Sequence, residues 1–436
     1  MAQQHQQRNQ PRISRVWPFQ HAYYGWAILT AGVFSAFATV PTQGPIVGLF
    51  NQQMRDDLGW SATDISIGFV AGSLAGGVIS WFIGGLLDRR GARVISAGSG
   101  VIIALAMVGL ALVQQPWQFW LLFGIARGTA SSGGQLSAVV SVASWFVRKR
   151  GRAVGFMGTG QRLGQALLPL PIFLVMDLFG WRQGWLLLGG VVLLFLTIPS
   201  GIFYRRRPED YGLLPDGAAS DMSGQADVAR ASDSVEVTWT LREAKRTRVL
   251  WLLILAQGGV VLSLNATNLH ITAHLLDNGI SFGRAVIATI VFATVSALTT
   301  LPWGFVTEHV HVRYVGLAST ATLAGTMIIA LFASTFAGAL LFAVLYGLAV
   351  GAWTVTSRML LANYFGRRSF GSIRGFAAPI MVTISLLGPL VAGPIRDTTG
   401  SYDAAFIVFA GVFVVSFFAL LFAPPPKKSA AVASEP

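Results

Sequence analysis

Three arginines lie inside long apolar stretches of the sequence, where a charged side chain needs a specific reason. They are Arg127, Arg162 and Arg358. A charge at the centre of a bilayer costs from about 3 to more than about 10 kcal/mol. All 18 Asp and Glu residues fall outside the middle of these stretches, so no acid is expected at the depth of Arg127 or Arg162. A guanidinium group in that setting attracts anions, and its planar fork of donors matches a carboxylate or a phosphate.

The sequence therefore predicts an anion site built on Arg127, Arg162 or both, with Arg358 as a third candidate. Each arginine also has a structural alternative, in which it caps helix carbonyls or faces water inside a helix bundle. Arg358 lies nearer the end of its stretch and can instead extend to the membrane surface.

Uncharged polar side chains accompany these arginines and complete the candidate substrate site. Gln165 lies about one turn after Arg162, and Gln135 lies two turns after Arg127 on the same helical face. Gln43 lies between two prolines, which free backbone carbonyls from helical hydrogen bonds. The other candidates are Asn265, Asn268 and His270. The alternative is that such side chains only bond neighbouring helices.

A site that takes up and releases a proton needs a titrating group, and the apolar stretches hold few. His270 and His274 are candidates, as is the carboxylate of the substrate itself. Packing of the two histidines near the end of their helix is the alternative, and anion exchange needs no titrating residue. With no Cys in the chain and no acid beside the pair, a metal site is not expected. The sequence shows no phosphate-binding loop and no catalytic triad, so it predicts neither an enzyme nor a cofactor.

Twelve apolar stretches supply the elements that must position these residues. Hydrophobic residues make up 53% of the 436 residues and charged residues only 11%, whereas a soluble domain has about 25% charged residues. A helix crosses a bilayer with about 20 apolar residues, and only helices satisfy every backbone group over such a span. The predicted spans are 24–49, 62–87, 94–113, 117–141, 153–177, 183–204, 249–275, 284–306, 314–333, 337–362, 372–395 and 403–423. The predicted fold class is an all-α membrane protein with 12 transmembrane helices.

The two halves of the chain resemble each other. A shift of 220 positions places Gly84 on Gly304 and Asp177 on Asp397. Two bundles related by a pseudo-two-fold axis are an architecture of secondary transporters, whose substrate site lies between the halves. The three arginines do not recur at this offset, which favours a role at one central site. The expected domains are a tail at 1–22, a six-helix bundle at 23–204, a linker with an amphipathic helix at 205–247, a second six-helix bundle at 248–423 and a tail at 424–436.

Basic residues are distributed unevenly between the two sides of the predicted membrane. Of the Lys and Arg residues, 24 lie in the tails and loops on the side of the termini, and four lie in loops on the opposite side. By the positive-inside rule, both termini lie in the cytoplasm. The formal net charge of +13 then reflects orientation and contact with the lipid bilayer rather than nucleic-acid binding. We expect a multi-pass protein of the cell inner membrane that works as a monomer.

The loop after the second predicted span carries a signature of its own, GGLLDRRGAR from residue 84. It resembles the G-x-x-x-D-R-x-G-x-R signature of the major facilitator superfamily, and a degenerate copy occurs 220 residues later. The resemblance implies a fold of two six-helix bundles and a latch that closes the cytoplasmic side. A static turn with orienting charges is the alternative. The residues of this cytoplasmic gate are Gly84, Asp88, Arg89, Gly91, Arg93, Glu308 and Arg313.

Further motifs narrow the resemblance to one branch of this superfamily. They include RPEDYGLLPDG at 207–217 and YFGRR at 364–368, and they are similar to the bacterial monocarboxylate porters and oxalate/formate antiporters. This resemblance implies transport of a small organic anion, a mono- or dicarboxylate, by alternating access, as proton symport or as anion exchange. One departure concerns the arginine that this branch commonly carries in the eighth span. Here that position is Thr300, and the position one turn earlier is Ser296.

Two other functions fit parts of the sequence. A multidrug or hydrophobic-solute exporter on the same fold predicts a cavity lined by aromatic residues, with the arginines turned away. The glycine-rich signature expected in the fifth span of such exporters is poorly matched by residues 160–169. A non-transporting sensor or assembly factor usually adds a soluble domain, and the sequence predicts none.

Overall fold

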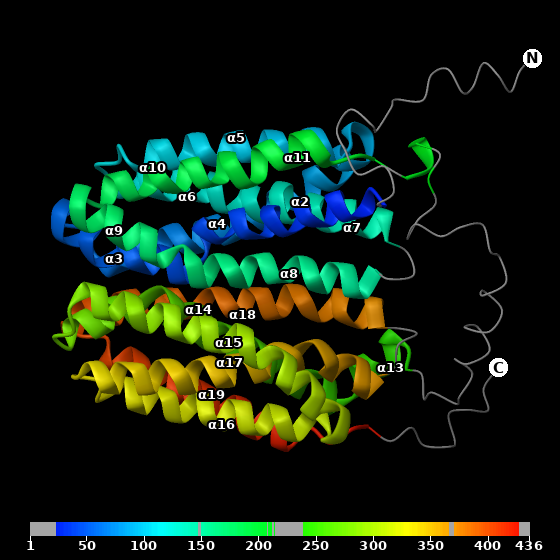
Figure 1. The fold of residues 1–436 in the computed structure, drawn as a ribbon. Coiled ribbons are helices and arrows are strands. Elements are labelled where there is room, and N and C mark those ends of the chain that lie inside the picture. The colour runs from blue at the N-terminus through cyan, green and yellow to red at the C-terminus, as the bar shows by residue number, and fades with distance from the viewer. Residues whose placement is uncertain are drawn as a thin grey trace, which may run out of the picture. The chain divides into compact units, whose positions relative to one another are not determined.

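A computed structural model describes residues 23–146, 150–206, 208–211, 213, 239–365 and 370–426. This part of the chain is built of helices and contains no strand, which confirms the all-α prediction. The chain divides into two compact units, Met1–Trp60 with Ile67–Gly224 and Ser61–Ser66 with Gln225–Pro436. Within each unit the long helices lie side by side as a bundle (Figure 1).

The first long helix of the N-terminal half is broken near its middle. α2 (Gly25–Ala38) and α3 (Gly44–Leu58) are separated by the short 3-10 helix Val40–Thr42. Pro41 and Pro45 explain the break, because a proline has no N–H to donate to the helical ladder. Gln43 is left in extended backbone as the N-cap of α3. The following helices are α4 (Ala62–Arg90), α5 (Ala92–Leu110), α6 (Pro116–Thr129), α7 (Ser137–Trp145), α8 (Arg150–Leu167), α9 (Pro169–Phe179), α10 (Trp181–Val192) and α11 (Ile198–Phe203).

Two helices of this half continue through π-helical stretches. Ala130–Leu136 joins α6 to α7, and Leu193–Thr197 joins α10 to α11. Such turns widen a helix locally and are frequent at functional sites. The first stretch carries Gln135, one of the predicted site residues.

The C-terminal half consists of longer, unbroken helices. They are α14 (Arg248–Asp277), α15 (Phe282–His309), α16 (Val312–Leu331), α17 (Phe336–Phe365), α18 (Phe370–Thr399) and α19 (Asp403–Leu421). The amphipathic helix expected at the end of the linker corresponds to α13 (Leu241–Arg246), which begins with a capping box between Thr240 and Glu243. Most of the expected linker, the tail at 1–22 and the end of the tail at 424–436 lie outside the described residues.

Ten stretches of the described chain are long and apolar enough to cross a membrane. The two predicted spans that do not reach this measure are α4 and the continuous segment from α6 to α7. α4 has 29 residues, and within the residues whose side chains the structure describes, Ala62–Gly76 forms a shorter apolar helix. For these two spans the count of 12 stays a prediction.

Each half contains an equivalent contact, at positions 220 residues apart in the sequence repeat. Arg93 Nε donates to the carbonyl of Gly201 at 2.6 Å. Arg313 donates to the carbonyl of Leu420 at 3.2 Å and to that of Leu421. In both halves a guanidinium group therefore holds the C-terminal end of the sixth helix, where the helix dipole favours a positive charge.

Backbone conformation recurs at the same offset. Gly59 and Gly279 follow α3 and α14 with φ of 68° and 83°, and Gly180 and Gly400 follow α9 and α18 with φ of 91° and 79°. Positive φ just after a helix strongly favours glycine. The internal repeat thus fixes how the equivalent helices end.

Candidate functional site

Arg162 belongs to a chain of polar side chains in the first unit. Its Nη1 donates to Gln165 Oε1 at 3.3 Å, and Gln165 Nε2 donates to Gln43 Oε1 at 2.7 Å. All three side chains are half-buried. Arg162 and Gln165 are one turn apart on α8, whereas Gln43 comes from the break between α2 and α3. The structure therefore brings together three of the predicted site residues.

The Gln165 amide that Arg162 binds is a neutral partner. An amide oxygen accepts a hydrogen bond but does not neutralise a guanidinium group. Once Gln43 Oε1 has accepted from Gln165, the Gln43 amide nitrogen still has two N–H groups that suit a further acceptor. The chain thus offers one positive group and nearby amide donors, a combination that binds a carboxylate together with a neighbouring oxygen.

Arg127 is held by protein groups of the first unit. Its Nε donates to Ser73 Oγ at 2.8 Å, and its Nη1 donates to the carbonyl of Thr42. Its Cζ lies 3.9 Å from the centroid of the Phe69 ring. A Cβ on Gly72 would lie 3.0 Å from the Arg127 side chain, so this glycine lets α4 approach it closely. This geometry supports the structural alternative for Arg127, in which it binds a carbonyl freed by the break after α2.

The other predicted substrate residues are more dispersed. Gln135 and Arg358 are exposed, on the π-helical stretch and on α17. Asn265 is half-buried on α14, and Asn268 Oδ1 accepts from the Tyr346 hydroxyl at 3.1 Å.

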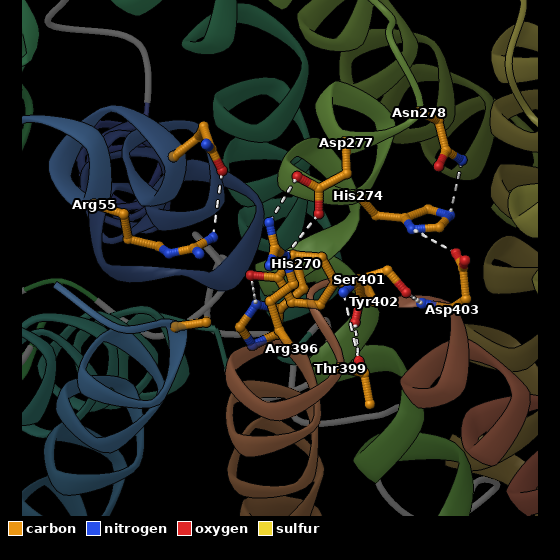
Figure 2. Close-up of polar contacts among 12 residues, drawn as sticks. Arg55, His270, His274, Asp277, Asn278, Arg396, Thr399, Ser401, Tyr402 and Asp403 are labelled. Carbon is orange, nitrogen blue, oxygen red and sulfur yellow. Dashed lines mark hydrogen bonds and ion pairs between the residues drawn. The ribbon is translucent and has the colours of Figure 1, made fainter. Parts of the chain in front are cut away.

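His270 lies in a buried polar cluster of the second unit. Its Nε2 is 3.2 Å from Ser66 Oγ in the first turns of α4, and its Nδ1 is 3.3 Å from the Tyr402 hydroxyl. The His270 and Tyr402 rings lie 5.0 Å apart between centroids. His270, Ser66 and Tyr402 are fully buried. Figure 2 shows His270 next to Tyr402, with Arg396 and Asp277 beside them.

Charged groups of α14 and α18 surround this cluster. Arg396 binds Asp277 with two hydrogen bonds, of 2.8 and 3.2 Å. The Asp397 carboxylate caps α4, because it accepts from the backbone N–H groups of Ala62 and Thr63 at 2.8 and 2.9 Å and from the Thr63 hydroxyl. The repeat drew attention to Asp397, but no pattern in the sequence indicated its partners.

His274 has a different environment one turn further along α14. Its Nε2 lies 3.0 Å from the carbonyl of Ala330, and its ring stacks on Phe406 at 4.3 Å between centroids. Its Nδ1 has no hydrogen-bond partner and lies 3.8 Å from the carboxylate of Asp403, as Figure 2 shows. In the described residues no three His, Cys, Asp or Glu side chains gather as a metal site.

Three residues of the predicted cytoplasmic gate have a described environment. Gly91 adopts φ of 78° as the residue before α5, and Arg93 and Arg313 bind the helix ends described above. The side chains of Asp88, Arg89 and Glu308, and the surroundings of Gly84, lie outside the described residues.

Two tyrosines form hydrogen bonds at helix ends of the first unit. The Tyr24 hydroxyl donates to the carbonyl of Phe203 at 2.8 Å, and the Tyr204 hydroxyl lies 2.8 Å from Ser35 Oγ. Both phenols serve as hydrogen-bonding anchors at the ends of their helices.

Comparison with known proteins agrees with this architecture. The family model described as Major Facilitator Superfamily matches residues 27–291 and 258–436. The "Probable L-galactonate transporter" of Escherichia coli (strain K12) is 27% identical over 406 residues, which cover 85% of this chain and 83% of that protein. Monocarboxylate transporter 11 of Homo sapiens is 25% identical over 342 residues, which cover 76% of this chain and 69% of that protein.

Solved structures show the same fold. The nucleoside transporter NupG aligns with a TM-score of 0.68 at 14% identity, covering 90% of this chain and 98% of that chain. A bacterial homologue of the human lysosomal transporter Spinster aligns with a TM-score of 0.66 at 16% identity, covering 93% of this chain and 96% of that chain. At these identities the likeness concerns the fold alone, and it confirms the predicted all-α membrane fold, while the count of 12 helices stays a prediction.

Proposed function

The chain belongs to the major facilitator superfamily, and we propose that it moves a small organic anion, a mono- or dicarboxylate, across the cytoplasmic membrane by alternating access. Family and relatives are transporters, so the chain is a multi-pass membrane transporter of a small molecule and not an enzyme. The relatives named above are described as transporters of monocarboxylates and of L-galactonate, and both substrates are organic anions.

The polar chain of Arg162, Gln165 and Gln43 is the observation that supports an anionic substrate best. A guanidinium group bonded to a neutral amide keeps its attraction for a carboxylate. Gln165 fixes the side chain of Arg162, and Gln43 offers its amide N–H groups to a second oxygen of the substrate. In this proposal Arg162 binds the carboxylate, and Gln43 and Gln165 orient it. Arg127 and Gln135 belong to the same half.

The same proposal assigns roles to the remaining predicted residues. Asn265, Asn268 and Arg358 are the contribution of the second half to substrate binding, whereas His270, predicted from the sequence for either role, is fully buried and is assigned to proton coupling. Six-helix bundles at 23–204 and 248–423 alternate between two arrangements, and both termini lie in the cytoplasm. Transport runs as proton symport or anion exchange, in a protein that works as a monomer in the inner membrane. The cytoplasmic gate is formed by Gly84, Asp88, Arg89, Gly91, Arg93, Glu308 and Arg313.

Replacement of Arg162 tests the anion site. Purified protein in proteoliposomes is assayed for uptake of a panel of radiolabelled carboxylates that includes L-lactate, oxalate and L-galactonate. Loss of a two-pronged contact to a carboxylate costs about 3 kcal/mol, so Arg162→Ala is expected to reduce kcat/KM about 100-fold. Arg162→Lys keeps the charge but not the planar pair of donors, and its kcat/KM is expected to lie between those of the wild type and Arg162→Ala.

Arg284→Ala is the matched control, because Arg284 lies in the first turn of α15 at a helix end. Its uptake is expected to stay at the wild-type rate. Normal uptake by a folded Arg162→Ala protein would remove Arg162 from the site. Failure of the wild-type protein to transport any carboxylate of the panel would remove the proposed substrate class.

A further inference from the structure

We propose that His270 is the residue that takes up the coupling proton. This inference rests on the proposed transport of an organic anion, and it selects proton symport over anion exchange. The observations that carry it are the two hydroxyl partners of the ring and its complete burial behind the first turns of α4.

The first partner fixes one ring nitrogen as a donor. The Ser66 hydroxyl donates its only proton to the carbonyl of Ala62 at 2.9 Å. Toward His270, 3.2 Å away, Ser66 Oγ can therefore only accept. Nε2 must carry a proton in this arrangement, whichever charge the ring has.

The second partner suits both charge states of the ring. A phenolic hydroxyl donates or accepts, and Tyr402 lies 3.3 Å from Nδ1. When His270 is neutral, the Tyr402 hydroxyl donates to Nδ1. When His270 is charged, Nδ1–H donates to the Tyr402 oxygen. A proton can thus be bound or released at Nδ1 without leaving a buried nitrogen unsatisfied, which would otherwise oppose one of the two states.

Charged residues lie on α4, α14 and α18, the helices that carry or adjoin His270 and its two hydroxyl partners. α18 contributes Arg396 and Asp397, α14 contributes Asp277, and the first turn of α4 contributes Asp64. Arg396 and Asp277 form one neutral pair. Asp397 adds a negative charge that caps α4, and Asp64 engages the backbone and hydroxyl of Ser61.

Burial couples the proton to a movement of the protein. The His270 ring is 0% exposed, so water reaches Nδ1 only when Tyr402 or the segment carrying Ser66 moves away. That segment is held by Asp397 through Ala62 and Thr63. Proton exchange is thus tied to one conformation of the first turns of α4, and such a link is what a coupled transporter requires.

His274 lacks these properties although it lies one turn away. Its Nε2 lies 3.0 Å from a backbone carbonyl and 3.3 Å from the amide nitrogen of Asn278, and its Nδ1 has no hydrogen-bond partner. The carboxylate of Asp403, which is 53% exposed, lies 3.8 Å from Nδ1. His274 is therefore the comparison residue within the same helix.

Uptake driven by a pH gradient tests the assignment. Carriage of one proton with a monovalent carboxylate moves no net charge, so a gradient of about one pH unit supports about tenfold accumulation. Proteoliposomes are assayed with L-lactate and with L-galactonate. Wild-type protein is expected to accumulate the transported substrate about tenfold. His270→Asn is expected to equilibrate it without accumulation, while substrate exchange at equal pH continues within about threefold of the wild-type rate.

The controls separate the possible failures. His274→Asn and His309→Asn are expected to accumulate substrate like the wild type, since His309 lies exposed at the end of α15. Accumulation by His270→Asn, or its loss only in His274→Asn, overturns the proposal. Exchange without accumulation in the wild type also overturns it, but leaves organic-anion transport intact.

A spectroscopic measurement decides the matter even without a transported substrate. The chain has six histidines, so protein labelled with nitrogen-15 histidine gives few resonances. The resonance missing from His270→Asn is expected to titrate between about pH 4 and about pH 9. A His270 resonance that stays constant over this range overturns the assignment.

Discussion

Loss of the Asp397 cap is expected to free the first turns of α4. The Asp397 carboxylate accepts two backbone N–H groups of α4 and the Thr63 hydroxyl. Helix caps contribute about 0.5 to 2 kcal/mol, and a negative charge at a helix N-terminus adds a few tenths. Asp397 is exposed, so we take about 1.4 kcal/mol, which is about a tenfold change in an equilibrium constant. Asp397→Ala should therefore raise the population in which this segment is released about tenfold.

The assay follows the accessibility of a single thiol. The natural chain has no cysteine, so Ser66→Cys places the only thiol of the protein on the released segment. Position 66 is fully buried, and labelling by a water-soluble thiol reagent at limiting concentration reports the released fraction. The labelling rate of Ser66→Cys is compared with and without Asp397→Ala.

Asp177→Ala in the same background is the matched control, because Asp177 is the counterpart of Asp397 in the sequence repeat. It should leave the labelling rate of the thiol at position 66 unchanged. A change of less than twofold with Asp397→Ala, or an equal increase with Asp177→Ala, would refute the inference that this cap holds the segment.

Two further predictions concern the repeat and the eighth span. Arg313→Ala is expected to lower the unfolding midpoint, measured by tryptophan fluorescence, more than Arg93→Ala does. Arg313 is half-buried and binds two carbonyls, a contribution of about 2 kcal/mol to stability. Arg93 is exposed and binds one carbonyl, a contribution of less than about 1 kcal/mol. A larger loss for Arg93→Ala would contradict this order. Thr300→Arg restores the arginine common in the monocarboxylate branch and is expected to change the ranking of carboxylates in the uptake panel, and an unchanged ranking would place this position outside the pocket.

Local spacing predicted the parts of the site that lie on one helix. Gln165 follows Arg162 by three residues, and helical geometry alone brings such side chains together. The structure joins them at 3.3 Å. The participation of Gln43 depends on packing of α8 against the break after α2, and a sequence carries no direct record of that contact. The fold class was predictable for a similar reason, since the length and composition of the apolar stretches allow only helices.

The contacts that the sequence did not predict join residues that lie far apart in the chain. The prolines around Gln43 indicated freed carbonyls, and Arg127 had carbonyl capping as an alternative, but only the structure pairs Arg127 with Thr42. Around His270 the partners come from positions 204 and 132 residues away, Ser66 and Tyr402. Neither partner has a residue type or a spacing that distinguishes it from other polar residues near helix ends.

α4 carries both the serine that contacts His270 and the serine that contacts Arg127. Ser66 Oγ and Ser73 Oγ each donate to the carbonyl four residues earlier, so each accepts from a basic side chain. His270 Nε2 lies at Ser66, and Arg127 Nε donates to Ser73. Seven residues of α-helix span two turns, about 10 Å, and no proline interrupts them. A displacement of the first turn of α4 that exposes His270 therefore also strains the Ser73 contact that anchors Arg127. In the proposed mechanism, α4 therefore links proton uptake at His270 to the half of the chain that contains Arg127 and Arg162.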